Sequence, residues 1–211
     1  ARAFDDARVV HVRTEGIGIA GALSLGLSRA RGGFIGRMDA DDVSLPGRFA
    51  AQRAMLVEDD SLAAVGARVE IDDASGPGMR AYVAWQNSLL TPQEHARDLF
   101  VESPLCHPST LLRRSALEAV GAWRDAPWPE DWDLWLRMSA AGFGLAKSSL
   151  VGLRWRHRPT RDQRKGRQNL CPSEVRRPLT IPFNPPAASA RLRGRERASG
   201  SAVFGTAGGE R

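Results

Sequence analysis

Three carboxylates fall within four positions directly after a short apolar run, and they limit the folds open to this chain. The run covers residues 34–36, and Asp39, Asp41 and Asp42 follow it. Like charges this close repel each other unless a cation shares them. Hard divalent ions bind one or two carboxylates and complete their coordination with phosphate oxygens and water. A strand ending in such a cluster predicts a ligand site at the carboxyl edge of an α/β sheet, with a solvated acidic turn as the alternative.

The segments around this cluster alternate between two hydrophobic patterns. Short apolar runs indicate strands, and apolar residues three or four positions apart indicate helices. Strands are expected at 8–13, 34–38, 62–71 and 150–155, and helices at 22–30, 46–58, 91–100, 115–120 and 130–141. This alternation predicts an α/β fold with a mixed sheet flanked by helices.

Local signals set some of the element boundaries. Thr91 and Glu94 have the spacing of a capping box at a helix start. Ser44 is expected to cap the helix that begins near Pro46. Residues 72–78 read Asp-Asp-Ala-Ser-Gly-Pro-Gly, which predicts a turn.

The excess positive charge lies in the C-terminal quarter of the chain. Residues 1–157 hold 18 Lys and Arg against 20 Asp and Glu, and residues 158–211 hold 12 against 4, which together give the chain's 30 and 24. The basicity is therefore a weak argument for a nucleic-acid partner, and none that is specific is expected. Residues 158–211 lack periodicity and are rich in Pro, Arg and Gly, so we predict a domain over 1–157 and a disordered tail over 158–211.

Several absences limit the protein class. Cys106 and Cys171 are far apart and fit no metal-ligand spacing. No apolar run approaches the roughly 18 residues of a membrane-spanning helix, and no signal peptide opens the chain. We therefore expect a cytoplasmic protein. The sequence starts at Ala1 and enters the predicted strand at 8–13 almost at once, so we expect an N-terminal part to be missing.

Two other enzyme classes use related motifs. Residues 16–21 match the dinucleotide fingerprint GxGxxG, between a predicted strand and helix and with an acidic residue about 20 positions later. A dehydrogenase needs one such carboxylate, however, and does not explain the pair Glu130 and Asp131. A phosphohydrolase with an aspartyl nucleophile fits less well, because its nucleophile follows a purely apolar strand and Arg37 interrupts this one.

Several segments in consistent order carry a resemblance to a known family. They are Arg37-Met-Asp-Ala-Asp-Asp42 with Pro46, Arg48 and Gln52 after it, then His107-Pro-Ser109, Gly121, and Glu130-Asp-Trp-Asp-Leu-Trp-Leu-Arg137. With these segments, residues 8–157 resemble the family 2 glycosyltransferases of the GT-A fold. The resemblance implies a Rossmann-like mixed sheet, here lacking its first strands. It also implies inverting, metal-dependent transfer of a sugar from a nucleotide-sugar donor to a hydroxyl acceptor.

The resemblance assigns the acidic cluster to the donor site. Asp41 would bind Mg²⁺ or Mn²⁺, and Asp39 would face the donor ribose and help to hold the metal. Asp42 would stabilise the loop or help to hold the metal through water. Arg37 would neutralise the cluster or approach the phosphates, and a plain salt bridge to Asp39 or Asp42 is the alternative.

The same resemblance places the catalytic base on the last helix. Asp131 matches the carboxylate that removes the acceptor's proton; the alternative is that Glu130 and Asp131 only favour the helix start. His157 matches a basic segment that in relatives lies near the diphosphate. Trp128, Trp132 and Trp135 would form an apolar wall for a sugar ring, or would pack in the core instead.

The expected partners follow from the family. They are a nucleotide-sugar donor, expected to be a UDP-sugar, and a glycan or lipid-linked acceptor in bacterial cell-envelope synthesis, with peripheral contact at the inner face of the membrane. The expected base-binding half of the nucleotide site is absent, which would leave this chain an inactive fragment. A non-catalytic alternative is a module whose basic tail binds anionic polymers or membranes.

Overall fold

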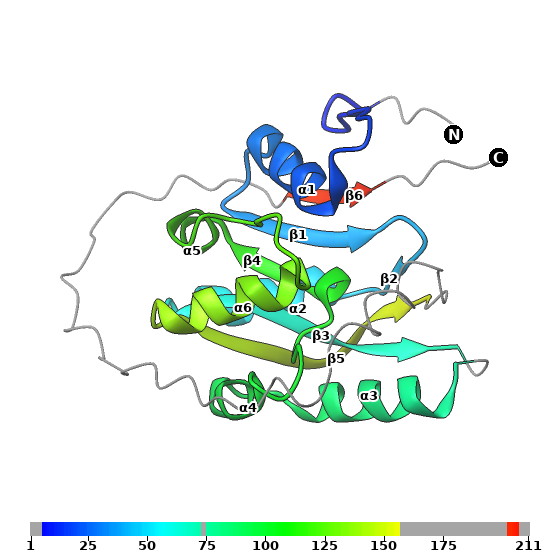
Figure 1. The fold of residues 1–211 in the computed structure, drawn as a ribbon, viewed down its shortest axis with the longest axis vertical. Helices are drawn as coiled ribbons and strands as arrows, with labels where there is room; N and C mark the ends of the chain where they lie inside the picture. Colours follow the sequence, from blue (N-terminus) through cyan, green and yellow to red (C-terminus); the bar gives the residue numbers. More distant parts are fainter. Residues whose placement is uncertain (1–5, 73–74, 157–201, 207–211) are drawn as a thin grey trace.

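The computed structural model describes residues 6–72, 75–156 and 202–206 of the chain. They form a six-stranded mixed sheet with the strand order β2-β5-β3-β4-β1-β6 (Figure 1). The strands are β1 (Phe34–Asp39), β2 (Val43–Ser44), β3 (Leu62–Ile71), β4 (Leu111–Arg113), β5 (Gly144–Trp155) and β6 (Ala202–Thr206). The helices are α1 (Gly18–Arg29), α2 (Arg48–Glu58), α3 (Pro77–Ser88), α4 (Pro92–Asp98), α5 (Arg114–Ala119) and α6 (Glu130–Ala140), with a 3₁₀ turn η1 (His107–Ser109).

The directions of the strands place the acidic loop at a sheet edge. β4 is antiparallel to both β1 and β3, and β3 is parallel to β5. Strands β1, β3 and β5 therefore run the same way, and their carboxyl ends meet at one edge, on the right in Figure 1. Asp39 is the last residue of β1, so the expectation of a carboxyl-edge position is confirmed.

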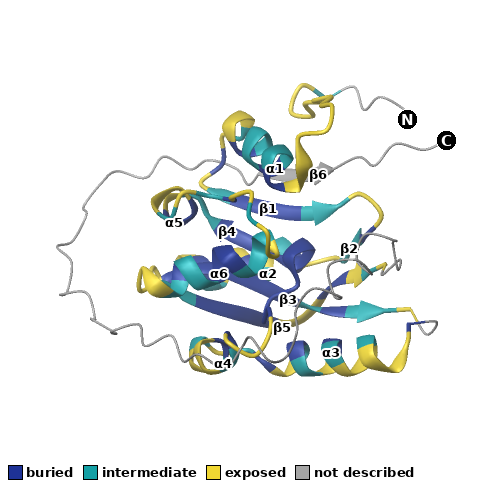
Figure 2. Cartoon of the chain, viewed as in Figure 1, coloured by how far each residue is buried: buried dark blue, intermediate teal, exposed yellow. Residues whose placement is uncertain are grey.

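Alternate residues of the strands bury the two faces of the sheet against different helices. Ile35, Ala64 and Leu112 belong to a core with residues of α1, α5 and α6. Their neighbours Val65 and Leu111 pack instead with Leu56 of α2. Side chains alternate across a strand with period two, so the sheet is buried on both faces, as the dark strands in Figure 2 show.

The predicted strand at residues 8–13 is wrong. These residues form no strand, and Val9, Val10 and Val12 are 44%, 61% and 42% exposed. Valines favour extended structure, but a strand needs a partner for its backbone groups. In the structure β6 occupies the edge beside β1, pairing Ile35 with Ala202 in parallel.

Two other boundary predictions also need correction. Ser44 does not cap α2, because it lies in β2 opposite Leu153 of β5; the helix follows Gly47, which has a φ of 82°. The turn predicted at 72–78 ends inside a helix that the sequence pattern missed, because Pro77 opens α3. The capping box of Thr91 and Glu94 is confirmed at the start of α4.

The predicted tail falls mostly outside the described residues. Positions 157–201 and 207–211 are not described, and residues 202–206 form the strand β6. The division of the chain at 157 stays a prediction. In the described residues, no helix is both long enough and apolar enough to cross a membrane.

Candidate active site

The loop after β1 holds its three carboxylates in different environments. The backbone N–H of Asp42 donates to the carbonyl of Asp39 at 3.2 Å, which closes a turn. Asp42 is buried, and its Oδ1 accepts the backbone N–H of Arg156 at 2.9 Å. Burial raises the pKa of Asp42 to about 6, and the nearby charges of Asp39 and Asp41 add to this while the Arg156 hydrogen bond opposes it. Asp42 therefore supports the loop from inside, as expected.

Arg37 pairs with the first of these carboxylates. Its guanidinium is buried, and Nη1 lies 2.6 Å from Oδ2 of Asp39, which is 32% exposed. Nη1 makes no hydrogen bond in spite of this short distance, so the contact is an ion pair without hydrogen-bond alignment. Of the roles predicted for Arg37, the structure contains the salt bridge to Asp39.

Asp41 is the exposed member of the cluster. Among the described residues, no set of three His, Cys, Asp or Glu side chains is arranged to hold a metal ion. The protein's own groups therefore form no closed cage here. A magnesium-type ion needs only one or two carboxylates when phosphates and water supply the other oxygens, and Asp41 with the half-exposed Asp39 fits that pattern.

Two buried side chains of α2 fix the end of β1 against η1. Nη2 of Arg48 donates to the carbonyls of Arg37 and Pro108, both at 2.8 Å. The amide of Gln52 donates to the carbonyls of Val65 and Ser109 at 2.6 and 2.7 Å. Arg48 is 1% and Gln52 0% exposed, so these two residues of the sequence pattern hold the fold together from inside.

A second acidic pair begins α6. Oε1 of Glu130 lies 3.2 Å from Nδ1 of His107, and Nε2 of His107 lies 3.0 Å from the indole nitrogen of Trp123. An indole N–H can only donate, so Nε2 accepts and Nδ1 carries the proton that it donates to Glu130. Burial alone would raise the pKa of Glu130, but the hydrogen bond from His107 leads the effects that keep it below its usual value.

Asp131 differs from its neighbour in its environment. Oδ2 accepts the hydroxyl of Ser103 at 3.1 Å, and Oδ1 accepts the backbone N–H of Trp132 at 2.8 Å. Burial raises the pKa of Asp131, and the charge of Glu130 adds to the rise. Two adjacent carboxyls whose pKa values are moved in opposite directions are typical of acid–base sites.

The third acid of α6 serves the structure. Asp133 is buried and accepts Nη2 of Arg124 at 2.9 Å and Nε of Arg137 at 2.8 Å. These two hydrogen bonds hold the pKa of Asp133 below its ordinary value in spite of burial. Its charge is therefore already neutralised, so Asp131 and Glu130 are the candidate acid–base groups at the start of this helix.

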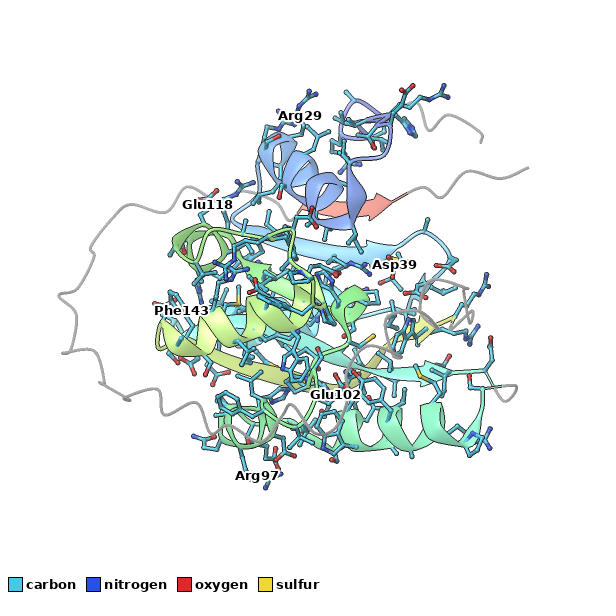
Figure 3. All side chains as sticks on the ribbon, in the orientation of Figure 1. Arg29, Asp39, Arg97, Glu102, Glu118 and Phe143 are labelled. Carbon is cyan, nitrogen blue, oxygen red and sulfur yellow. The ribbon has the colours of Figure 1, made fainter. Side chains whose placement is uncertain are left out.

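The structure links the strand before the acidic loop to the start of α6 through η1 and the residue after it. The backbone N–H of Arg37 donates to the carbonyl of Thr110 at 3.0 Å, and His107 reaches Glu130 from the same turn. The charge of Arg37 also acts on Glu130. Asp39 lies toward the N-terminal end of α6 and away from Phe143, which follows that helix (Figure 3). Predicted residue His157 lies outside the described residues.

The glycine-rich segment does not have the structure of a dinucleotide site. Gly16 and Gly18 have φ values of 65° and 68°, and α1 begins at Gly18. The fingerprint requires a strand directly before the glycines, and residues 8–13 form none. The dehydrogenase alternative is therefore not supported by the local fold.

The comparisons with known proteins agree with the sequence pattern. The family model "Glycosyl transferase family 2" matches residues 1–121, which is more than half of the chain. The chain belongs to the family 2 glycosyltransferases. The amylovoran biosynthesis glycosyltransferase AmsE of Erwinia amylovora is 28% identical over 131 residues, which is 62% of this chain and 47% of AmsE. An uncharacterized glycosyltransferase of Haemophilus influenzae is 27% identical over 129 residues, 61% of this chain and 46% of its own length.

A solved structure supports the fold of this family 2 domain. The mannosyltransferase PcManGT of Pyrobaculum calidifontis, solved with GDP-Man and Mn²⁺, has a TM-score of 0.50 and 20% identity, and the match covers 73% of this chain and 41% of that one. The mixed sheet with flanking helices is thus a GT-A fold. The chain spans less than half the length of these relatives.

Of the three tryptophans predicted either to form an apolar wall or to pack in the core, one packs in the core of this glycosyltransferase domain. Trp135 is 0% exposed and packs in the core, so it cannot contact a sugar. Trp128 is 56% exposed, and with Trp132 it lines a small hollow of about 190 Å³ beside Leu136. A larger groove of about 650 Å³ lies between α2 and α4, and no predicted site residue lines it.

Proposed function

We propose that this family 2 domain transfers a sugar from a nucleoside diphosphate donor to a hydroxyl acceptor with inversion at the sugar carbon. The supporting observation is that η1 and Thr110, the residue after it, contact both acidic regions. The backbone N–H of Arg37, two residues before Asp39, donates to Thr110, and His107 bonds to Glu130, the neighbour of Asp131. One region can hold a charged diphosphate, and the other can accept a proton. Single-displacement transfer needs both at the same edge of the sheet.

The β1 loop would hold the donor's diphosphate through a divalent ion. Asp41 is exposed and would bind the ion, with Asp39 as its second protein ligand. Bound Mg²⁺ or Mn²⁺ would stabilise the negative charge that develops on the leaving diphosphate. Arg37 keeps one positive charge beside Asp39, which lowers the repulsion between the loop and an anionic donor.

Asp131 would act as the base. The acceptor hydroxyl loses its proton to the Asp131 carboxylate as its oxygen bonds to the sugar carbon and the bond from that carbon to the diphosphate oxygen breaks. Of the two adjacent carboxyls, Glu130 is already committed to His107. Asp131 has the raised pKa, and a base with a pKa nearer to working pH is more effective.

We propose a more specific donor and acceptor than the fold alone indicates. We infer a UDP-sugar as donor and a glycan or lipid-linked acceptor, with the reaction on the cytoplasmic side of the cell envelope. The solved relative holds GDP-Man and Mn²⁺, which supports a nucleotide-sugar and a divalent ion as a class. Titration with UDP and with GDP in parallel separates the two nucleotides.

The metal site is tested by isothermal titration of UDP with and without Mn²⁺. Asp41→Ala should weaken the Mn²⁺-dependent binding at least tenfold. Asp60→Ala is the matched control, because Asp60 is 92% exposed and lies just before β3, at the opposite edge of the sheet. Equal binding by Asp41→Ala and the unaltered protein would remove Asp41 from the site.

The role of Asp131 as the base is tested in an enzyme preparation with measurable turnover. Asp131→Asn keeps the size of the side chain but cannot accept the proton, so kcat should fall about 10²–10⁴-fold while donor affinity changes little. The anomeric configuration of the product, read by NMR, tests inversion. Normal turnover by Asp131→Asn would show that this carboxylate only stabilises the helix start.

A further inference from the structure

The Asp131 carboxylate is held from outside its own helix by a single hydroxyl. Among the described residues, two hydrogen bonds reach it: the Trp132 backbone N–H is local to α6, and the Ser103 hydroxyl comes from the segment between α4 and η1. The Ser103 hydroxyl also lies 3.4 Å from the carbonyl of Leu105. It has one hydrogen to donate, and the 3.1 Å contact with Asp131 is the shorter.

The segment that carries Ser103 is fixed independently of Asp131. The carbonyl of Ser103 accepts the Tyr82 hydroxyl at 3.0 Å and the Gln86 amide at 3.1 Å, both from α3. The next carbonyl, of Pro104, accepts Nζ of Lys147 from β5 at 3.2 Å. Ser103 itself is only 6% exposed. The hydroxyl is therefore presented to Asp131 by a backbone that two other elements hold in place.

Several charged or titratable groups face the Asp131 carboxyl. His107 of η1, when protonated, favours its ionised form, whereas Glu130 of α6 opposes ionisation. Burial raises the pKa of the thiol of Cys106, directly before η1, and the charges of Asp42 and Asp131 add to the rise. A hydrogen bond donated to a carboxylate stabilises the ionised form, so the Ser103 hydroxyl acts in the same direction as His107.

We propose that Ser103 is a positioning residue for the catalytic base: its hydroxyl fixes Oδ2 of Asp131 and keeps this half-buried carboxyl ionised, leaving the carboxylate ready to accept the acceptor's proton. The bond between Ser103 and Asp131 is a property of this chain, and its catalytic purpose rests on the proposed function. Without the hydroxyl, burial and the charge of Glu130 would raise the pKa of Asp131 further. The carboxyl would then be protonated over a wider range of pH and free to rotate.

The test is an NMR titration of the full chain labelled with ¹³C in its aspartate carboxyls, with Asp131→Asn used to identify the signal. Ser103→Ala should raise the pKa of Asp131 and weaken its ionisation about tenfold, the usual scale for one hydrogen bond to a charged group. Ser103→Thr keeps the hydroxyl and should restore the original titration. If Ser103→Ala does not fold, Ser103→Cys, whose thiol is a weak donor, should show the same rise.

Ser148→Ala is the matched control. Ser148 is also 6% exposed, but its hydroxyl accepts a backbone N–H from Leu150 and makes no contact with Asp131. This variant should leave the Asp131 titration unchanged. An unaltered Asp131 titration in Ser103→Ala or Ser103→Cys would overturn the proposal, whatever happens to activity.

A second measurement separates this proposal from the proposed function. In a form that turns over, Ser103→Ala should move the acidic limb of the kcat profile to higher pH, and Ser103→Thr should return it. If the NMR titration moves while Asp131→Asn keeps normal turnover, the assignment of the base has failed, and the positioning role of Ser103 falls with it. If Asp131→Asn is inactive but the NMR titration does not move, the proposal for Ser103 alone is wrong.

Discussion

Replacing Lys147 with methionine should remove a pH dependence from the stability of the fold. Lys147 is 2% exposed, and its Nζ donates to the carbonyls of Gln86 and Pro104. Burial lowers the pKa of Lys147 from 10.5 to about 7, and no carboxylate is among the causes that modify it. Between these two values the unfolded chain binds more protons at this position than the folded chain. Raising the pH therefore stabilises the folded state.

The size of the effect follows from the two pKa values. With about 7 in the folded chain and 10.5 in the unfolded chain, linkage gives a gain of about 3 kcal/mol between pH 7 and pH 9.5. Lys147→Met cannot titrate, so it lacks this gain. The variant also loses two hydrogen bonds, but that loss is nearly constant with pH. The slope of stability against pH therefore isolates the buried charge.

Urea unfolding at several pH values between 7 and 9.5 measures this slope. The chain has one tyrosine and two lysines, so few other groups titrate in the upper part of this range. Arg53→Met is the control, because Arg53 is an exposed cation on α2, and its profile should run parallel to that of the unaltered protein. Parallel profiles for Lys147→Met as well would show that the lysine is not held in a dehydrated environment.

Three further changes test other parts of the structure. Asp42→Asn should stabilise the protein above pH 6 relative to the unaltered chain. Burial raises the pKa of Asp42 to about 6, so its ionisation between pH 4 and pH 6 costs the folded chain stability. Urea unfolding at pH 4 and pH 7 measures this, and an equal change in unfolding free energy at both pH values would refute it. Gly152→Ala should cost about 1–3 kcal/mol, since a Cβ there would lie 2.7 Å from Cβ of Ala67, and a loss below 0.5 kcal/mol by thermal unfolding would contradict it. Thr91→Ala should cost about 0.5–2 kcal/mol by removing the capping box with Glu94, and unchanged urea unfolding would contradict it.

Features that depend on neighbours in sequence were predictable. The apolar run before the acidic cluster became β1, the alternating segment at 62–71 became β3 with the same bounds, and Thr91 with Glu94 capped α4. In each case local hydrogen bonding or burial periodicity decides the structure. The acidic start of α6 was likewise visible, because acids complement the dipole at a helix N-terminus.

Features that depend on distant pairing were not predictable. Val9, Val10 and Val12 have strand propensity, but β6 takes the place beside β1, and no local signal shows which segment will do so. Ser103 had no signal either, because its link to Asp131 spans 28 positions. The role of a buried polar side chain such as Ser103 can be assigned only when its hydrogen-bond partners are known.

The roles of Arg48 and Gln52 were missed for a related reason. Their spacing suggested membership of a family motif, and motif residues are readily taken for ligand contacts. In the structure they donate to the carbonyls of Arg37, Pro108, Val65 and Ser109. Those acceptors are backbone carbonyls from three separate segments. The amino-acid types at these positions therefore do not indicate that they accept these hydrogen bonds.

The position of β6 sets an order for folding. The other five strands are complete by residue 155, and the longest pairing among them joins Val43 of β2 to Arg154 of β5. Ile35 pairs with Ala202, about one and a half times as far along the chain. A longer loop costs more entropy to close, roughly 0.6 kcal/mol for each doubling of its length. During synthesis the central sheet can therefore assemble before residues 202–206 have left the ribosome. β1, the strand that leads into the acidic loop, would gain its outer partner last.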